Sequence, residues 1–255
     1  MRERILAELQ RVEREQGVRV LFGCESGSRA WGFASPDSDW DVRFIYAHDL
    51  NWYLSVETHR DVIERMLPDD LDLAGWDIRK ALGLLRKSNP SLLEWLNSPI
   101  IYRADESFLK EIRALAQSTW SASRLLHHYL SMARSNSRTY LQGEQVSRKK
   151  YLYALRPLLA AQWIERGSGL PPIEFDRLRA ASDLDVATQG AIDRLLEQKK
   201  VGNELAAGPP IPELSAFIDS ELERLDGLRS VEAGAPNLEL FDIFFRKWIG
   251  RKNAL

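Results

Sequence analysis

The chain has a single cysteine, Cys24, among its 255 residues. One cysteine cannot form an internal disulfide, and it also excludes a cysteine-rich zinc site. Long apolar runs are missing too, since none approaches the roughly 20 residues that a membrane-spanning helix needs. Neither sign of charge dominates, because 35 Lys and Arg stand against 37 Asp and Glu, a net of −2. These absences exclude a wholly basic nucleic-acid coat protein and predict a globular, cytoplasmic protein without membrane contact.

The first hundred residues mix helical and strand patterns. Residues 1–16 place apolar side chains on one stripe of a charged helix, which Gly17 ends. Short apolar runs rich in β-branched residues predict four strands, at 18–24, 39–46, 61–66 and 71–77. A turn-like Pro/Asp cluster, LPDD, separates the last two runs.

Helical periodicity takes over from Ile78. Asn89 and Pro90 are suited to cap and begin a second short helix over 91–96. Beyond about residue 120 the pattern is helical throughout. We therefore predict the α+β class, with an N-terminal α+β domain over residues 1–105 and an all-helical domain over residues 106–255.

The segment from Gly27 to Asp41 carries residues suited to chemistry on phosphates. Gly27 allows a ligand to approach the backbone closely, and Ser28 opens a short helix whose amides can bind phosphate oxygens. Asp39 and Asp41 are two residues apart on an expected strand, so their carboxylates share a face. Paired carboxylates of this kind can converge on two divalent ions, the arrangement used for in-line phosphoryl transfer.

A structural interpretation of the same residues is a plain turn followed by an Asp-x-Asp cap or calcium loop. Asp is depleted in strands, however, and two like charges without a counter-ion destabilise a fold. The combination of turn, spacing and strand therefore favours a metal site. Arg43 shares the face of the two carboxylates and either offsets their charge or contacts a substrate.

The stretch GSRAWGFASPDSDWDVRF, residues 27–44, resembles the Gly-Ser and paired-acid motif of the DNA polymerase β-type nucleotidyltransferases. Together with two later stretches, DLAGWDIRKALGLLRKSNPSLLEWLNSPIIY and KKYLYALRPLLAAQWIE, it resembles the RlaP-type, RNA-repair-associated members. The likeness spans about residues 18–175. One departure is that Cys24, Glu25 and Ser26 intervene between the expected strand end and the Gly-Ser pair.

The resemblance implies a polymerase β-like domain with a mixed sheet and flanking helices. It also implies transfer of a nucleoside monophosphate from an NTP to an acceptor hydroxyl, with Mg²⁺ or Mn²⁺ as cofactor. In this sequence the family's metal carboxylates fall on Asp39 and Asp41, and its phosphate turn falls on Gly27 and Ser28.

The family further requires a third carboxylate on a later strand, as general base and metal ligand. Asp77 is the preferred candidate, because it ends a predicted strand and Gly75 leaves room for a ligand. Asp72 is the alternative, and the odd spacing places the two on opposite faces of a regular strand. Asp77 is equally suited to cap the helix that follows it.

Between Arg134 and Arg156, six basic residues stand against one acid, a net of +5. Related nucleotidyltransferases use a Lys and a Tyr of the helical domain on the triphosphate, which implies that role for Lys149 or Lys150 with Tyr153. The alternative is a solvated basic face.

The RlaP likeness implies an RNA end as the acceptor. A protein hydroxyl, or a small molecule such as an aminoglycoside, is an alternative acceptor within the same chemistry. A catalytically idle nucleotide-binding module is the alternative from a different class. The sequence indicates no oligomeric state.

Overall fold

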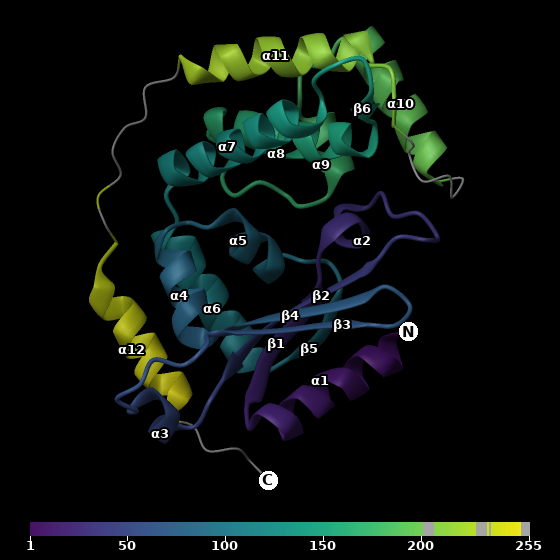
Figure 1. Ribbon diagram of the computed structural model, residues 1–255. Helices are drawn as coiled ribbons and strands as arrows, with labels where there is room; N and C mark the ends of the chain where they lie inside the picture. Colours follow the sequence, from purple (N-terminus) through teal and green to yellow (C-terminus); the bar gives the residue numbers. More distant parts are fainter. Residues whose placement is uncertain (201–206, 228–233, 235, 251–255) are drawn as a thin grey trace. The chain divides into compact units, whose positions relative to one another are not determined.

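The computed structural model describes residues 1–200, 207–227, 234 and 236–250 (Figure 1). The chain divides into two compact units. The first comprises residues 1–30, 39–120 and the segment from residue 234 onward, and the second comprises residues 31–38 and 121–233. This division differs from the predicted domains 1–105 and 106–255. Of the predicted helical domain, residues 201–206, 228–233, 235 and 251–255 lie outside the described part of the chain.

The first unit is built on a five-stranded mixed sheet in the order β3-β4-β2-β1-β5. Its strands are β1 (Arg19–Glu25), β2 (Trp40–Ala47), β3 (Val62–Leu67), β4 (Leu71–Asp77) and β5 (Ile101–Ala104). Strands β2 and β4 pair in parallel, and the other pairs are antiparallel. The α+β class and the four predicted strands are confirmed, whereas β5 is a short strand that the sequence pattern did not predict.

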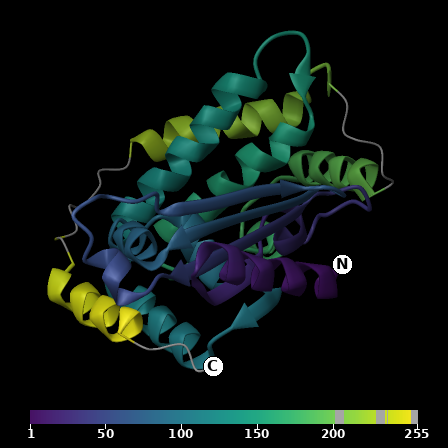
Figure 2. The same cartoon turned by 60° about the horizontal axis from the view of Figure 1, so that its bottom comes forward.

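Helix α1 (Arg2–Gln16) lies against one face of this sheet in both views (Figures 1 and 2). It buries one apolar stripe, as its periodicity predicts. The stripe packs with the alternate, inward-facing residues of the central strands. The buried members of this core are Ile5, Leu9, Val12, Val18, Val20, Val42, Phe44, Tyr46, Leu71, Leu73 and Tyr102.

The alternate residues of β2 and β4 therefore face the opposite side of the sheet. On that side Trp76 of β4 stacks on Trp95 of α5 (Pro90–Leu96), with ring centroids 3.7 Å apart. The caps predicted from the sequence are confirmed, since Asn89 accepts from the Leu92 amide at 3.1 Å with Pro90 in the first turn.

Gly75 serves packing rather than ligand approach. A β-carbon on Gly75 would lie 2.1 Å from the ring of Phe44. The glycine therefore lets the Phe44 ring pack closely against β4, and the space that the sequence suggested for a ligand is filled by the core.

Further helices of this unit are α3 (Leu50–Tyr53), α4 (Ile78–Arg86), α6 (Glu106–Thr119) and α12 (Leu238–Ile249). Helix α12 belongs to this unit although it comes last in the sequence. Its Trp248 ring lies edge-on to Phe108 of α6 at 5.0 Å, and its Phe245 ring meets Tyr53 of α3 at 5.1 Å. Aromatic burial therefore holds the end of the described chain to the sheet-bearing unit.

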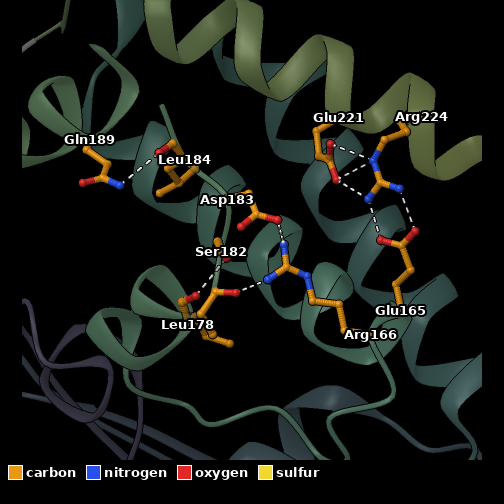
Figure 3. A network of polar contacts seen from close by, with 10 residues as sticks. Glu165, Arg166, Leu178, Ser182, Asp183, Leu184, Gln189, Glu221 and Arg224 are labelled. Atoms are coloured by element: carbon orange, nitrogen blue, oxygen red, sulfur yellow. Dashed lines mark hydrogen bonds and ion pairs between the residues drawn. The ribbon is translucent and has the colours of Figure 1, made fainter. Parts of the chain in front are cut away.

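The second unit is helical, with α7 (Ala122–Tyr140), α8 (Lys149–Glu165), α9 (Phe175–Ala180), α10 (Val186–Lys200) and α11 (Pro212–Asp226). Two short strands, β6 (Val146–Ser147) and β7 (Ala207–Gly208), pair beside them. Figure 3 shows Arg224 of α11 between Glu221 of its own helix and Glu165 at the end of α8. These two carboxylates raise the pKa of Arg224 and tie α11 to α8. No helix within the described residues is long and apolar enough to cross a membrane.

Candidate active site

The two carboxylates of Asp41 and Asp72 lie side by side on neighbouring strands. Strands β2 and β4 run in parallel, and their register pairs Asp41 directly with Asp72. Both residues face away from α1, because their neighbours Val42 and Leu73 belong to the core on the other face. Their side chains are 25% and 28% exposed. Two acidic groups therefore meet at a partly open position on this face of the sheet.

Arg43 joins these two carboxylates. Its Nη2 lies 2.9 Å from Asp41 Oδ1 and 2.8 Å from Asp72 Oδ2. Its Nη1 also donates to the carbonyl oxygen of Asp72 at 3.2 Å. Of the two interpretations of Arg43, the structure shows the one in which the guanidinium offsets carboxylate charge. The position between Asp41 and Asp72 thus attracts a positive group.

Gly27 lies against the other oxygen of the Asp41 carboxylate. A β-carbon on Gly27 would stand 1.9 Å from Asp41 Oδ2, and the residue has a φ of +58°. Both features require glycine. Gly27 begins the short helix α2 (Gly27–Trp31), in which Ser28 is buried. The predicted Gly-Ser turn therefore directly adjoins one of the predicted metal carboxylates.

The apparent departure from the family motif disappears in the structure. Strand β1 does not end at Gly23 but continues through Glu25, with a shift in register between Gly23 and Cys24. The Ser26 amide then donates to the carbonyl oxygen of Asp41 at 2.8 Å. The strand thus runs almost directly into the Gly-Ser turn.

Asp39 lies just before β2 and is exposed. Its carbonyl oxygen accepts from Arg29 Nε at 3.0 Å, and the Arg29 guanidinium stacks over the Trp40 ring at 3.7 Å. Arg29 belongs to α2, so α2 and the segment bearing Asp39 and Asp41 are held together at several points.

Asp77 is not brought together with Asp41. The ladder pairs Asp77 with Tyr46, five positions beyond the Asp41–Asp72 pair, or roughly 16 Å at about 3.3 Å per residue. Asp77 is 1% exposed, caps α4 through the Arg79 amide at 2.7 Å, and accepts from the Tyr53 hydroxyl at 2.7 Å. Burial raises its pKa. The cap interpretation is confirmed, and the geometry favours Asp72 over Asp77 beside Asp41.

Glu25 is a residue of this site that the sequence did not single out. It is 0% exposed, and burial raises the pKa of its carboxyl. Its Oε1 accepts from the Asp41 amide at 2.8 Å, and its Oε2 accepts from the Tyr102 hydroxyl. In the sequence, Glu25 could have been found as an acidic residue at the end of an apolar strand, two residues before Gly27.

Lys149, Lys150 and Tyr153 lie in the first turns of α8, in the helical unit. The Lys150 Nζ lies over the rings of Tyr140 and Tyr153, at 4.4 and 4.8 Å from their centroids. Tyr153 also meets the Trp31 ring edge-on at 5.3 Å. The role of these residues on a triphosphate stays a prediction.

The donor set of the candidate site suits a hard divalent cation. Within the described residues, no three His, Cys, Asp or Glu side chains form a preassembled metal cage. Mg²⁺ does not need one, because it binds through one or two carboxylates and completes its shell with water and substrate phosphates. Asp41 and Asp72, which both form ion pairs with the Arg43 guanidinium, provide carboxylates of this kind.

The sequence has a counterpart among known families. A profile of the RlaP family, described as an RNA repair pathway DNA polymerase beta family, matches residues 1–247. The chain belongs to this family. RlaP membership supports a nucleotidyltransferase type of activity.

One relative of this RlaP chain is the uncharacterized protein YcgL of Bacillus subtilis (strain 168). It is 45% identical over 225 residues, which cover 88% of this chain and 86% of YcgL. A solved structure of a nucleotidyltransferase-like protein from Exiguobacterium sibiricum 255-15 aligns with 94% of this chain and 75% of its own. That alignment has 14% identity and a TM-score of 0.30.

Proposed function

We propose that this protein is a metal-dependent nucleotidyltransferase that moves a nucleoside monophosphate from an NTP to an acceptor hydroxyl, with an RNA end as the acceptor. The observation that carries the proposal is the parallel register that sets Asp41 beside Asp72, with Gly27 against the Asp41 carboxylate. Membership of an RNA repair pathway family supports RNA as the acceptor.

In the proposed reaction, a bond forms between the acceptor oxygen and the α-phosphorus, and the bond to pyrophosphate breaks. Gly27 and Ser28 bind phosphate oxygens at the start of α2, where the first backbone amides of a helix have no partner within the helix. Asp72 takes the proton of the acceptor hydroxyl as general base. Arg43, which lies between the two carboxylates, keeps them in place and limits their repulsion.

Asp39 and Asp41 are the residues that would hold Mg²⁺ or Mn²⁺, with Asp72 beside them. The cation supplies charge stabilisation for the transferring phosphoryl group when it is bound. The protein contributes the fixed position of the carboxylates, which the contacts of Gly27, Ser26 and Arg29 provide.

The proposal is tested by incubating the protein with each α-³²P-labelled NTP, Mg²⁺ or Mn²⁺, and separate pools of RNA, DNA and protein. We expect label to appear in RNA only when the metal is present, with one unlabelled pyrophosphate released for each labelled nucleotide transferred. Label in the protein pool alone would replace RNA by a protein acceptor. Absence of metal-dependent transfer to every pool, and to small hydroxylated compounds, would contradict the proposed activity.

Gly27→Ala is expected to lower the transfer rate by about 100-fold, because displacement of a positioned group by about 1 Å has that effect. The new β-carbon would overlap Asp41 Oδ2 and force the carboxylate to move. Gly17→Ala is the matched control, since Gly17 has a φ of +61° and nothing within 4 Å of an added β-carbon.

Gly27→Ala and Gly17→Ala each place a β-carbon on left-handed backbone, and this strain lowers the stability of each variant by about 1–2 kcal/mol. Thermal melts should therefore show a loss for both variants, whereas rate assays at saturating NTP should show a loss for Gly27→Ala only. Equal rates for the two variants would mean that the Asp41 carboxylate does not need its position against Gly27.

A further inference from the structure

Glu25 differs from the other acids near the site because water does not reach it. The side chain is 0% exposed and lies at the end of β1, where the ladder pairs Glu25 with Val42. A carboxylate in such a place destabilises a fold unless each of its oxygens is hydrogen-bonded. Its presence in an apolar strand therefore requires an explanation from its contacts.

Those contacts connect three segments of the sheet-bearing unit. Oε1 accepts from the Asp41 amide at 2.8 Å, and Oε2 accepts from the Tyr102 hydroxyl of β5. The backbone of Glu25 takes part as well, because its carbonyl oxygen accepts from Ser98 Oγ at 2.6 Å and its amide donates to Ile100 at 2.9 Å. Glu25 is thus fixed from the β5 side and presents one oxygen to Asp41.

The bond to Asp41 replaces a backbone partner that the sheet cannot offer. The β1–β2 ladder ends at the Glu25–Val42 pair, because the chain turns into α2 at Gly27. The Asp41 amide is one residue beyond the end of this ladder, and the Glu25 side chain supplies its acceptor. The Asp41 carbonyl is held by the Ser26 amide, so both peptide groups of Asp41 are anchored.

We propose that Glu25 is a positioning residue, whose buried carboxylate fixes the backbone of Asp41 and thereby the direction of the Asp41 carboxylate. The inference rests on the proposed function, because it matters for activity only if Asp41 holds the metal. Glu25 itself is too buried to touch a substrate. Residues that orient a metal ligand typically change metal affinity or activity by about 10–100-fold when they are replaced.

The first test needs no ligand. Exchange of the Asp41 amide proton, followed by NMR in the metal-free protein, is expected to accelerate at least tenfold in Glu25→Ala and to stay near wild type in Glu25→Gln. The glutamine oxygen can still accept from that amide, whereas alanine leaves the amide without its acceptor. Unchanged exchange in Glu25→Ala would overturn the proposal.

The second test is calorimetric titration of Mn²⁺ together with ATP, GTP, CTP or UTP in turn, without an acceptor. We expect Glu25→Ala to weaken Mn²⁺–NTP binding by about 10–100-fold, and Glu25→Gln to restore most of it. Ile112→Ala, a truncation in the buried face of α6, is the control for lost stability and should bind normally once folded.

Tyr102→Phe and Tyr46→Phe form a matched pair. Tyr102 donates to Glu25, whereas the buried Tyr46 hydroxyl has no hydrogen-bond partner among the described residues. Removing the Tyr102 hydroxyl should weaken Mn²⁺–NTP binding, as Glu25→Ala does, and removing the Tyr46 hydroxyl should leave binding unchanged.

Absence of Mn²⁺–NTP binding by the wild type would overturn the proposed function and this role of Glu25 with it. Normal binding by both the wild type and Glu25→Ala would overturn the role of Glu25 alone.

Discussion

Asp41→Asn is expected to lower the rate of nucleotide transfer by about 10³-fold or more, because charge stabilisation by a bound metal is worth several kcal/mol and each ~1.4 kcal/mol is a factor of ten. Asparagine keeps the volume of the side chain beside Gly27 and still accepts from Arg43. It lacks the negative charge that makes a carboxylate a strong ligand for a divalent cation. Initial rates with saturating NTP measure the effect.

The fold should survive this change. Arg43 keeps its ion pair with Asp72 at 2.8 Å, and partly exposed pairs contribute little to stability. Asp39→Asn should change the rate in the same direction. Asp105→Asn is the control, because Asp105 caps α6 through the Phe108 amide and asparagine caps equally well. Near-normal transfer by Asp41→Asn would remove Asp41 from the metal site.

Asp72→Asn is expected to slow nucleotide transfer strongly, whereas Asp77→Asn is expected to leave the transfer rate unchanged. Asp72 lies beside Asp41 and is expected to act on the acceptor proton, so its replacement should slow the chemical step by about 10²–10⁴-fold. NTP affinity should change much less, since Asp39 and Asp41 remain. A single-turnover rate with saturating NTP separates the chemical step from binding.

Asp77→Asn should leave the rate near wild type. The asparagine oxygen retains the cap on α4, and the side-chain amide group of asparagine can donate to the Tyr53 hydroxyl. Burial raises the pKa of Asp77 above its ordinary value of 3.8, so ionising the wild-type residue costs stability as the pH rises from that value through the folded-state pKa. The variant should therefore gain in melting temperature relative to wild type over this range. A collapsed rate in Asp77→Asn with a normal rate in Asp72→Asn would move the site to the other face of β4.

Sequence patterns that involve only neighbouring residues predicted much of the secondary structure of the first unit. The alternation in residues 39–46 correctly placed Trp40, Val42 and Phe44 on the core face and left Asp41 and Arg43 on the other. The turn before β4 and the capping of α5 by Asn89 also follow from residues close together in the chain. These features depend on neighbours within a few residues, which is why the sequence alone sufficed.

The third carboxylate could not be chosen in this way. The choice between Asp72 and Asp77 depends on the register of β4 against β2, two strands about thirty residues apart whose parallel pairing no local pattern specifies. Glu25 was missed for a related reason. Its role depends on β1 continuing past Gly23, and on Tyr102 and Ser98 arriving from a distant part of the chain.

The C-terminal helix is a further case of non-local packing. The pattern of Leu238–Ile249 predicts an amphipathic helix but not the surface that buries it. The structure packs its aromatic side chains on α6 and α3 of the sheet-bearing unit. Sequence position alone had placed this helix in the predicted helical domain.

The most direct test of the central claim is anomalous diffraction from crystals grown with Mn²⁺ and a non-hydrolysable NTP analogue. The account predicts an Mn²⁺ peak within about 2.1 Å of carboxylate oxygens of Asp41, with Asp39 or Asp72 and the analogue's phosphates completing the shell. It also predicts that Asp77 keeps its bonds to Tyr53 and Arg79. An Mn²⁺ peak at Asp77, or a bound analogue with no metal at Asp41, would contradict it.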